Sequence, residues 1–101
     1  MRVDTLRVDG YAREKVGLAA ITLKGGRRKK DKLLKVAQST LSAVSAKDFA
    51  DAELRLHWDE IYSALTQKGK YSESVDAMTE AEAASIAGRI VALDRLIGDE
   101  D

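Results

Sequence analysis

The chain has 101 residues, which suits one domain with a single modest core, and it contains no cysteine and no proline. Without cysteine it has neither a disulfide framework nor thiolate chemistry, which is compatible with a reducing compartment, and we expect a cytoplasmic protein. No apolar run approaches the roughly 18 residues that span a bilayer, and the mixed-charge N-terminus does not resemble a secretory signal, so we expect no membrane association.

The formal net charge is zero, but the charges are unevenly distributed. Residues 1–32 contain 10 basic and 4 acidic side chains, a balance of +6, whereas residues 71–101 contain 2 basic and 8 acidic ones, a balance of −6. Two arrangements agree with this asymmetry. The two regions lie side by side within the monomer, or they form opposite ends through which copies associate weakly and in a salt-sensitive way.

The pattern at the beginning of the chain agrees with more than one secondary structure. Residues 1–10 fit either a short strand or an irregular arm. Residues 11–23 have apolar side chains at helical spacing, which favours a helix, yet the alternation of Val16, Leu18 and Ala20 also permits a strand.

A basic connection that contains two glycines follows at residues 24–31. Its consecutive bases repel one another and are expected to lie in water. They are candidates for following a phosphate backbone, because each such contact adds salt-sensitive affinity. No aromatic residue interleaves them, and no helix-turn-helix or zinc-finger spacing accompanies them, so nucleic-acid binding is the alternative function. The candidate nucleic-acid contacts are Arg27, Arg28, Lys29 and Lys30.

The middle of the chain predicts two amphipathic helices. Asp31 is expected to cap the first, which covers residues 32–44. The second covers residues 49–68 and carries an apolar stripe about 100° wide that includes the only tryptophan, so we expect it at the centre of the core. The expected core residues of this stripe are Leu54, Trp58, Ile61, Tyr62 and Leu65.

The opposite face of this second helix carries an apolar pair, Phe49 and Leu56, about 20° apart in helical projection. We expect the N-terminal segment to pack on this pair, because large apolar side chains are usually buried. The alternative is an exposed contact site for a protein partner.

A polar connection over residues 70–78 leads to the best-defined helix start in the chain. Thr79 and Glu82 have the spacing of a capping box, in which each side chain accepts a hydrogen bond from the other residue's backbone N–H. The helix is expected over residues 80–97, with an acidic tail at 98–101. Its expected core residues are Ile86, Ile90, Leu93 and Ile97.

The sequence offers little for catalysis. His57 is the only histidine, and no cysteine, HExxH or GxSxG pattern supplies the partners that zinc or nucleophilic chemistry needs. Asp59 and Glu60 are adjacent, so on a helix they point about 100° apart and cannot act as a facing pair. Asp94 interrupts an apolar stripe and is expected at its water-exposed rim. We therefore expect no enzyme, no cofactor, no metal ion and no small-molecule substrate.

Together these patterns predict an all-α fold, with one domain over residues 1–101. The expected architecture is a small bundle of three to four helices with an irregular or short-strand N-terminal arm. The expected function is that of a non-enzymatic interaction or regulatory module that docks onto another protein or onto itself.

Overall fold

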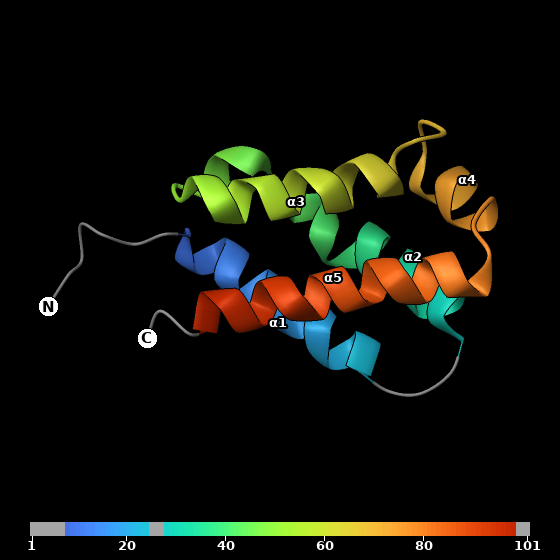
Figure 1. Cartoon of the computed structure of the whole chain (residues 1–101), viewed down its shortest axis with the longest axis horizontal. Helices are drawn as coiled ribbons and strands as arrows, with labels where there is room; N and C mark the ends of the chain where they lie inside the picture. Colours follow the sequence, from blue (N-terminus) through green and yellow to red (C-terminus); the bar gives the residue numbers. More distant parts are fainter. Residues whose placement is uncertain (1–7, 25–27, 99–101) are drawn as a thin grey trace, which may run out of the picture.

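The computed structural model describes residues 8–24 and 28–98 of the chain (Figure 1). Within these residues an isolated antiparallel β-bridge joins Val8 to Phe49, and every other regular element is helical. The all-α prediction is confirmed. The α-helices are α1 (Gly10–Lys24), α2 (Lys29–Ser39), α3 (Ala52–Leu65), α4 (Tyr71–Asp76) and α5 (Glu80–Gly98), and two 3₁₀ turns cover Leu41–Ala43 and Ala46–Asp48.

The last helix, α5, is the element on which the others assemble. It packs against α1, α2 and α3. In Figure 1, α3 runs along one side of α5 and α1 crosses behind it. The sequence pattern instead predicted that α3, the helix that contains Trp58, would lie at the centre of the core. A helix with alanines among its inward positions lets neighbouring backbones approach closely, so α5 accommodates three partners. The buried residues of α5 are Ala83, Ala87, Ile90, Leu93 and Ile97.

The first and last helices run antiparallel and side by side. A guanidinium nitrogen of Arg13 donates to the backbone carbonyl of Ile97 at 3.3 Å. One turn further along α1, a Cβ at Gly17 would lie 3.5 Å from the Asp94 carboxylate, which is half-buried. The described helices of the basic and acidic thirds, α1 and α5, are therefore neighbours within the monomer, as in the first of the two arrangements that the charge distribution permitted. Association between copies stays a prediction.

Local capping moves two of the expected helix boundaries. The second helix begins at Ala52 instead of residue 49, because the Asp51 carboxylate accepts from the backbone N–H groups of Glu53 (2.9 Å) and Leu54 (3.1 Å). It ends at Leu65 instead of residue 68. The connection from α3 to α5, expected to be a polar loop over residues 70–78, contains the short helix α4.

The helix expected over residues 32–44 is also shorter and begins earlier. It starts at Lys29, so Asp31 lies in its first turn and is not its N-cap. At the other end Thr40 leaves the helical region with φ −121°, and the chain continues in the first 3₁₀ turn.

The capping box at the start of α5 is confirmed. The Thr79 N–H donates to Glu82 Oε1 at 2.8 Å, and the Glu82 N–H donates to Thr79 Oγ1 at 3.0 Å. Met78 before the box and Ala83 after it are both buried, as in a hydrophobic staple. Because this signal is local in sequence, it placed the helix start correctly.

The core includes most of the two apolar stripes. On α3 the side chains of Leu54, Trp58, Ile61 and Leu65 are buried, and Ile86 on α5 is half-buried. Tyr62 is the exception, because 45% of it is exposed, so its assignment to the core is wrong. Its ring lies at the rim of the stripe and is tilted against the Trp58 ring, with centroids 6.1 Å apart.

Candidate functional site

Two lysines of the basic run form hydrogen bonds within the fold. The Lys29 ammonium donates to the carbonyl of Leu23 at 2.6 Å, and the Lys30 ammonium donates to the carbonyl of Asp76 at 3.1 Å. These carbonyls lie in the last turns of α1 and α4, where helices have unpaired acceptors and a negative dipole end. Two of the four candidate nucleic-acid contacts therefore bind helix ends, and both are half-buried instead of fully exposed to water.

Of the other two bases, Arg28 is exposed and has a left-handed backbone, with φ 59°. Arg27 lies outside the described residues. Among the three described bases, the two lysines are directed to helix-end carbonyls, and nucleic-acid binding by the run stays a prediction.

Phe49 is not an exposed partner contact. It is fully buried, lies before α3 in extended conformation, and its ring stacks on Trp58 with centroids 5.8 Å apart. The β-bridge to Val8 and a 2.7 Å hydrogen bond from the Asp9 N–H to the Asp48 carbonyl bring the N-terminal segment against it. Leu56, the other member of the expected pair, remains 60% exposed on α3.

The outward side of α1 carries apolar side chains that the sequence pattern did not single out. Tyr11, Leu18 and Ile21 are 53%, 49% and 68% exposed, and their spacing of seven and three residues places them along one side of the helix. The Lys15 ammonium lies over the Tyr11 ring, 5.1 Å from its centroid. The signal in the sequence was the presence of apolar residues all around this helix.

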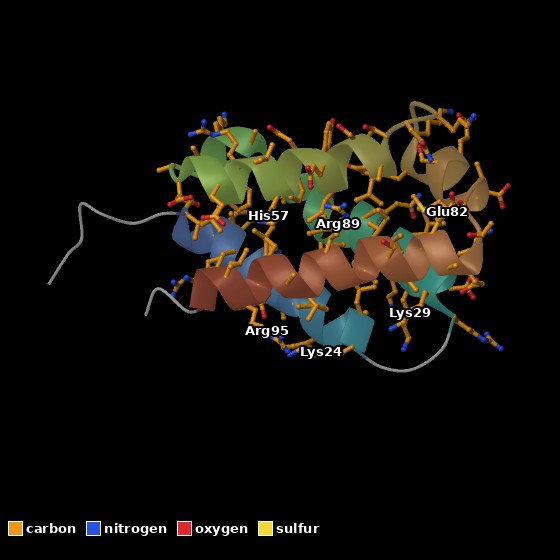
Figure 2. The ribbon with its side chains drawn as sticks, viewed as in Figure 1. Lys24, Lys29, His57, Glu82, Arg89 and Arg95 are labelled. Carbon is orange, nitrogen blue, oxygen red and sulfur yellow. The ribbon has the colours of Figure 1, made fainter. Side chains whose placement is uncertain are left out.

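Basic side chains border these residues. Lys24 ends α1 and Arg95 lies on α5, and both are exposed. Figure 2 shows the two side chains on the α1 side of α5, whereas His57 and Arg89 lie between α3 and α5. The α1 face is defined here as Tyr11, Leu18 and Ile21 with the bases Lys15, Lys24 and Arg95. It also contains one exposed acid, Glu14, which is three residues after Tyr11 and four before Leu18.

The exposed surface of α3 around Leu56 carries acidic side chains, two of which, Asp59 and Glu60, also line a cavity between α3 and α5. Leu56 is three or four residues from Glu53, Asp59 and Glu60, so these exposed carboxylates are its neighbours on the helix surface. Glu60 forms an ion pair with Arg89 of α5. The α3 face is defined here as Leu56 with Glu53, Asp59 and Glu60.

An open cavity lies where α2, the end of α3 and the start of α4 meet. Its walls include the rings of Tyr62 and Tyr71. Burial, and the nearby Tyr62 phenol, raise the pKa of the Tyr71 phenol above its ordinary value of 10.0. Tyr71 therefore remains a neutral hydrogen-bond donor over the physiological pH range.

This raised pKa predicts a contribution to stability in alkaline solution. Because folding holds the Tyr71 proton more tightly than the unfolded chain does, this contribution is complete below about pH 10 and is lost as the pH rises through the raised value. Tyr71→Phe should remove this part of the alkaline loss of stability, measured by urea unfolding on both sides of that pH. If the free energy of unfolding falls by the same amount with pH in the variant and the wild type, the alkaline loss of stability does not come from Tyr71.

The described part of the chain holds no group of three metal-ligating side chains that could bind a metal ion. None of the helices in residues 8–24 and 28–98 combines the length and apolar character needed to cross a bilayer. Comparisons with protein-family models, with curated proteins and with solved structures found no match. Any functional assignment therefore depends on the surfaces of this chain.

Proposed function

We propose that the protein is a non-enzymatic interaction module that docks through the α1 face onto the α3 face of a second copy. The observation that supports this is the exposure of Tyr11, Leu18 and Ile21 along one side of α1, bordered by bases. Monomeric proteins commonly expose single apolar side chains, whereas a row of them with a charged border is typical of a contact surface.

Charge complementarity favours a second copy as the occupant. The α3 face presents Leu56 beside the carboxylates of Glu53 and Asp59, so it offers the α1 face both an apolar contact and opposite charge, while Glu60 is paired with Arg89 of its own chain. The two faces belong to different helices, and their apolar side chains are all exposed in one molecule, so both faces are available at once. The contact is heterologous and allows head-to-tail association.

The association should be weak and sensitive to salt. Exposed ion pairs contribute only about 0–1 kcal/mol each, and the screening length falls from about 30 Å at 0.01 M salt to about 8 Å at 0.15 M. We expect light scattering to give an average mass above the 11.0 kDa monomer at low salt and high protein concentration, returning toward that value at moderate salt. A monomer under every condition would contradict docking between copies.

A mixing experiment distinguishes the two faces. Variant K24E/R95E changes the α1 face and variant E53K/D59K changes the α3 face, and each alone should be monomeric at low salt. Mixed together they should associate, because each variant's altered face meets a complementary face on the other. A matched control, K35E/K47E, alters two exposed bases on other elements and should associate like the wild type apart from its changed net charge. Failure of the mixture to associate, with all variants folded, would refute the assignment of these faces.

A further inference from the structure

The cavity beside Tyr62 and Tyr71 has walls that suit a ligand. Its volume is about 350 Å³, near the lower end of the range of roughly 300–1,000 Å³ found for small-molecule sites. It is open to solvent and lies apart from the α1 face. Its side-chain walls come from Gln38, Tyr62, Thr66, Lys70, Tyr71 and Ser72.

The aromatic part of the wall is held in place from behind. The Tyr62 ring is tilted against Trp58, whose ring in turn stacks on the buried Phe49. Tyr71 is half-buried and packs against the core. Two phenol rings that are supported in this way present apolar surface and hydroxyl groups without a large entropic cost on binding.

The loop that carries Lys70 is also fixed by hydrogen bonds. The Gly69 N–H donates to the Thr66 carbonyl at 2.8 Å, and Gly69 has φ 95°, a conformation that glycine adopts without strain. Beyond it, the buried Ser74 hydroxyl accepts from the Lys68 N–H at 2.9 Å. The cavity wall is thus formed before any ligand arrives.

The charge of this cavity differs from that of its neighbours. Its described lining contains one cation, Lys70, together with hydroxyl and amide groups, and no carboxylate. The adjoining cavity, which shares Ser72, is lined by carboxylates as well as by Lys30. Two further cavities between α3 and α5 also include carboxylates. An anion placed beside Lys70 therefore meets donors without a facing negative charge.

We propose that this cavity binds a small aromatic anion. Its ring lies against Tyr62 and Tyr71, and its carboxylate or phosphate group accepts hydrogen bonds from the Lys70 ammonium and the Ser72 hydroxyl group. The Thr66 hydroxyl is not available as a donor, because it donates to the Tyr62 carbonyl at 2.7 Å. This binding site is independent of docking between copies, and it adds a ligand class that the sequence pattern did not indicate.

The only tryptophan provides a reporter for this site, because its ring contacts Tyr62. Titration with benzoate at constant ionic strength should change the Trp58 fluorescence with a saturable curve. Benzamide has the ring without the charge and acetate has the charge without the ring, so both should bind about tenfold or more weakly. Phenyl phosphate, in a parallel titration, tells which oxyanion the site prefers.

Variants at the loop test the role of the cation. Lys70→Gln should weaken benzoate binding about tenfold and leave the binding of benzamide unchanged. The matched control is Lys68→Gln, because Lys68 is exposed in the same loop but does not line the cavity. Changes in the backbone amide chemical shifts on adding benzoate give a second measurement. These changes should be confined to the neighbourhood of Gln38, Tyr62 and residues 66–72.

Several outcomes would overturn the proposal. These are the absence of a saturable change in both measurements for benzoate and phenyl phosphate, equal affinity for benzoate and benzamide, or equal weakening by Lys68→Gln and Lys70→Gln. Amide shifts spread over the whole surface would have the same consequence. None of these outcomes affects the association experiments on the α1 and α3 faces.

Discussion

Replacing Trp58 with alanine should lower the free energy of unfolding by about 3–5 kcal/mol. Trp58 is 2% exposed and lies between the rings of Phe49 and Tyr62. Removing the indole group therefore loses its transfer free energy and leaves a cavity that two aromatic neighbours cannot fill without moving. Since small domains have only about 5–15 kcal/mol of stability, a large part of the total would be lost.

Urea unfolding followed by far-UV circular dichroism measures this change. The control is Leu56→Ala on the same helix, which removes a side chain that is 60% exposed and should change the stability by less than about 0.5 kcal/mol. If Trp58→Ala unfolds at the same urea concentration as the wild type, then the tryptophan does not pack as described.

The parts of the fold that the sequence predicted are those with local causes. The Thr79–Glu82 capping box involves residues three apart, so its signal was complete within one turn of helix. The buried stripes on α3 and α5 followed from helical periodicity alone. In contrast, α4 has only six residues, too short for a periodic pattern to reveal it.

Which side chains are exposed depends on contacts between residues far apart in the sequence, so the surfaces could not be predicted from local patterns. Lys30 binds a carbonyl 46 residues further along the chain, so its structural use is invisible in the basic run itself. Tyr62 lies at the edge of a stripe, where its exposure depends on which neighbours pack beside it. Helical periodicity did not single out the outward apolar residues of α1, because it does not tell which apolar side chains outside the buried stripe remain exposed.

For Phe49, the sequence predicted correctly that the N-terminal segment packs on its side chain, but it wrongly placed the residue within the helix. Periodicity extended the helix back to Phe49, but Asp51 is a better N-cap and starts it at Ala52. Because Phe49 lies outside the helix, its backbone is extended. It forms the β-bridge to Val8, and its ring stacks on Trp58. The N-terminal segment covers it, as expected for a large apolar group.

Phe49→Ala should therefore destabilise the fold by about 3–5 kcal/mol, as much as the loss of the tryptophan. Phe49 is fully buried, and its carbonyl accepts a 3.1 Å hydrogen bond from Arg55 Nε, which fixes the backbone beneath the ring. Without the ring the segment that begins at Val8 loses its packing surface. Faster amide hydrogen exchange is expected at Asp9, whose N–H donates to the Asp48 carbonyl.

A double-mutant cycle separates the stacking from simple loss of volume. Phe49→Leu and Trp58→Leu each remove the ring but keep more apolar volume than alanine does, so each should cost less than the corresponding alanine variant, and the coupling between them should be about 0.5–1.5 kcal/mol. Coupling near zero would show that the two rings contribute independently, through burial alone. Unchanged exchange at Asp9 in Phe49→Ala would contradict the N-terminal packing, because that packing requires the β-bridge, the Asp9 hydrogen bond and the ring to act together.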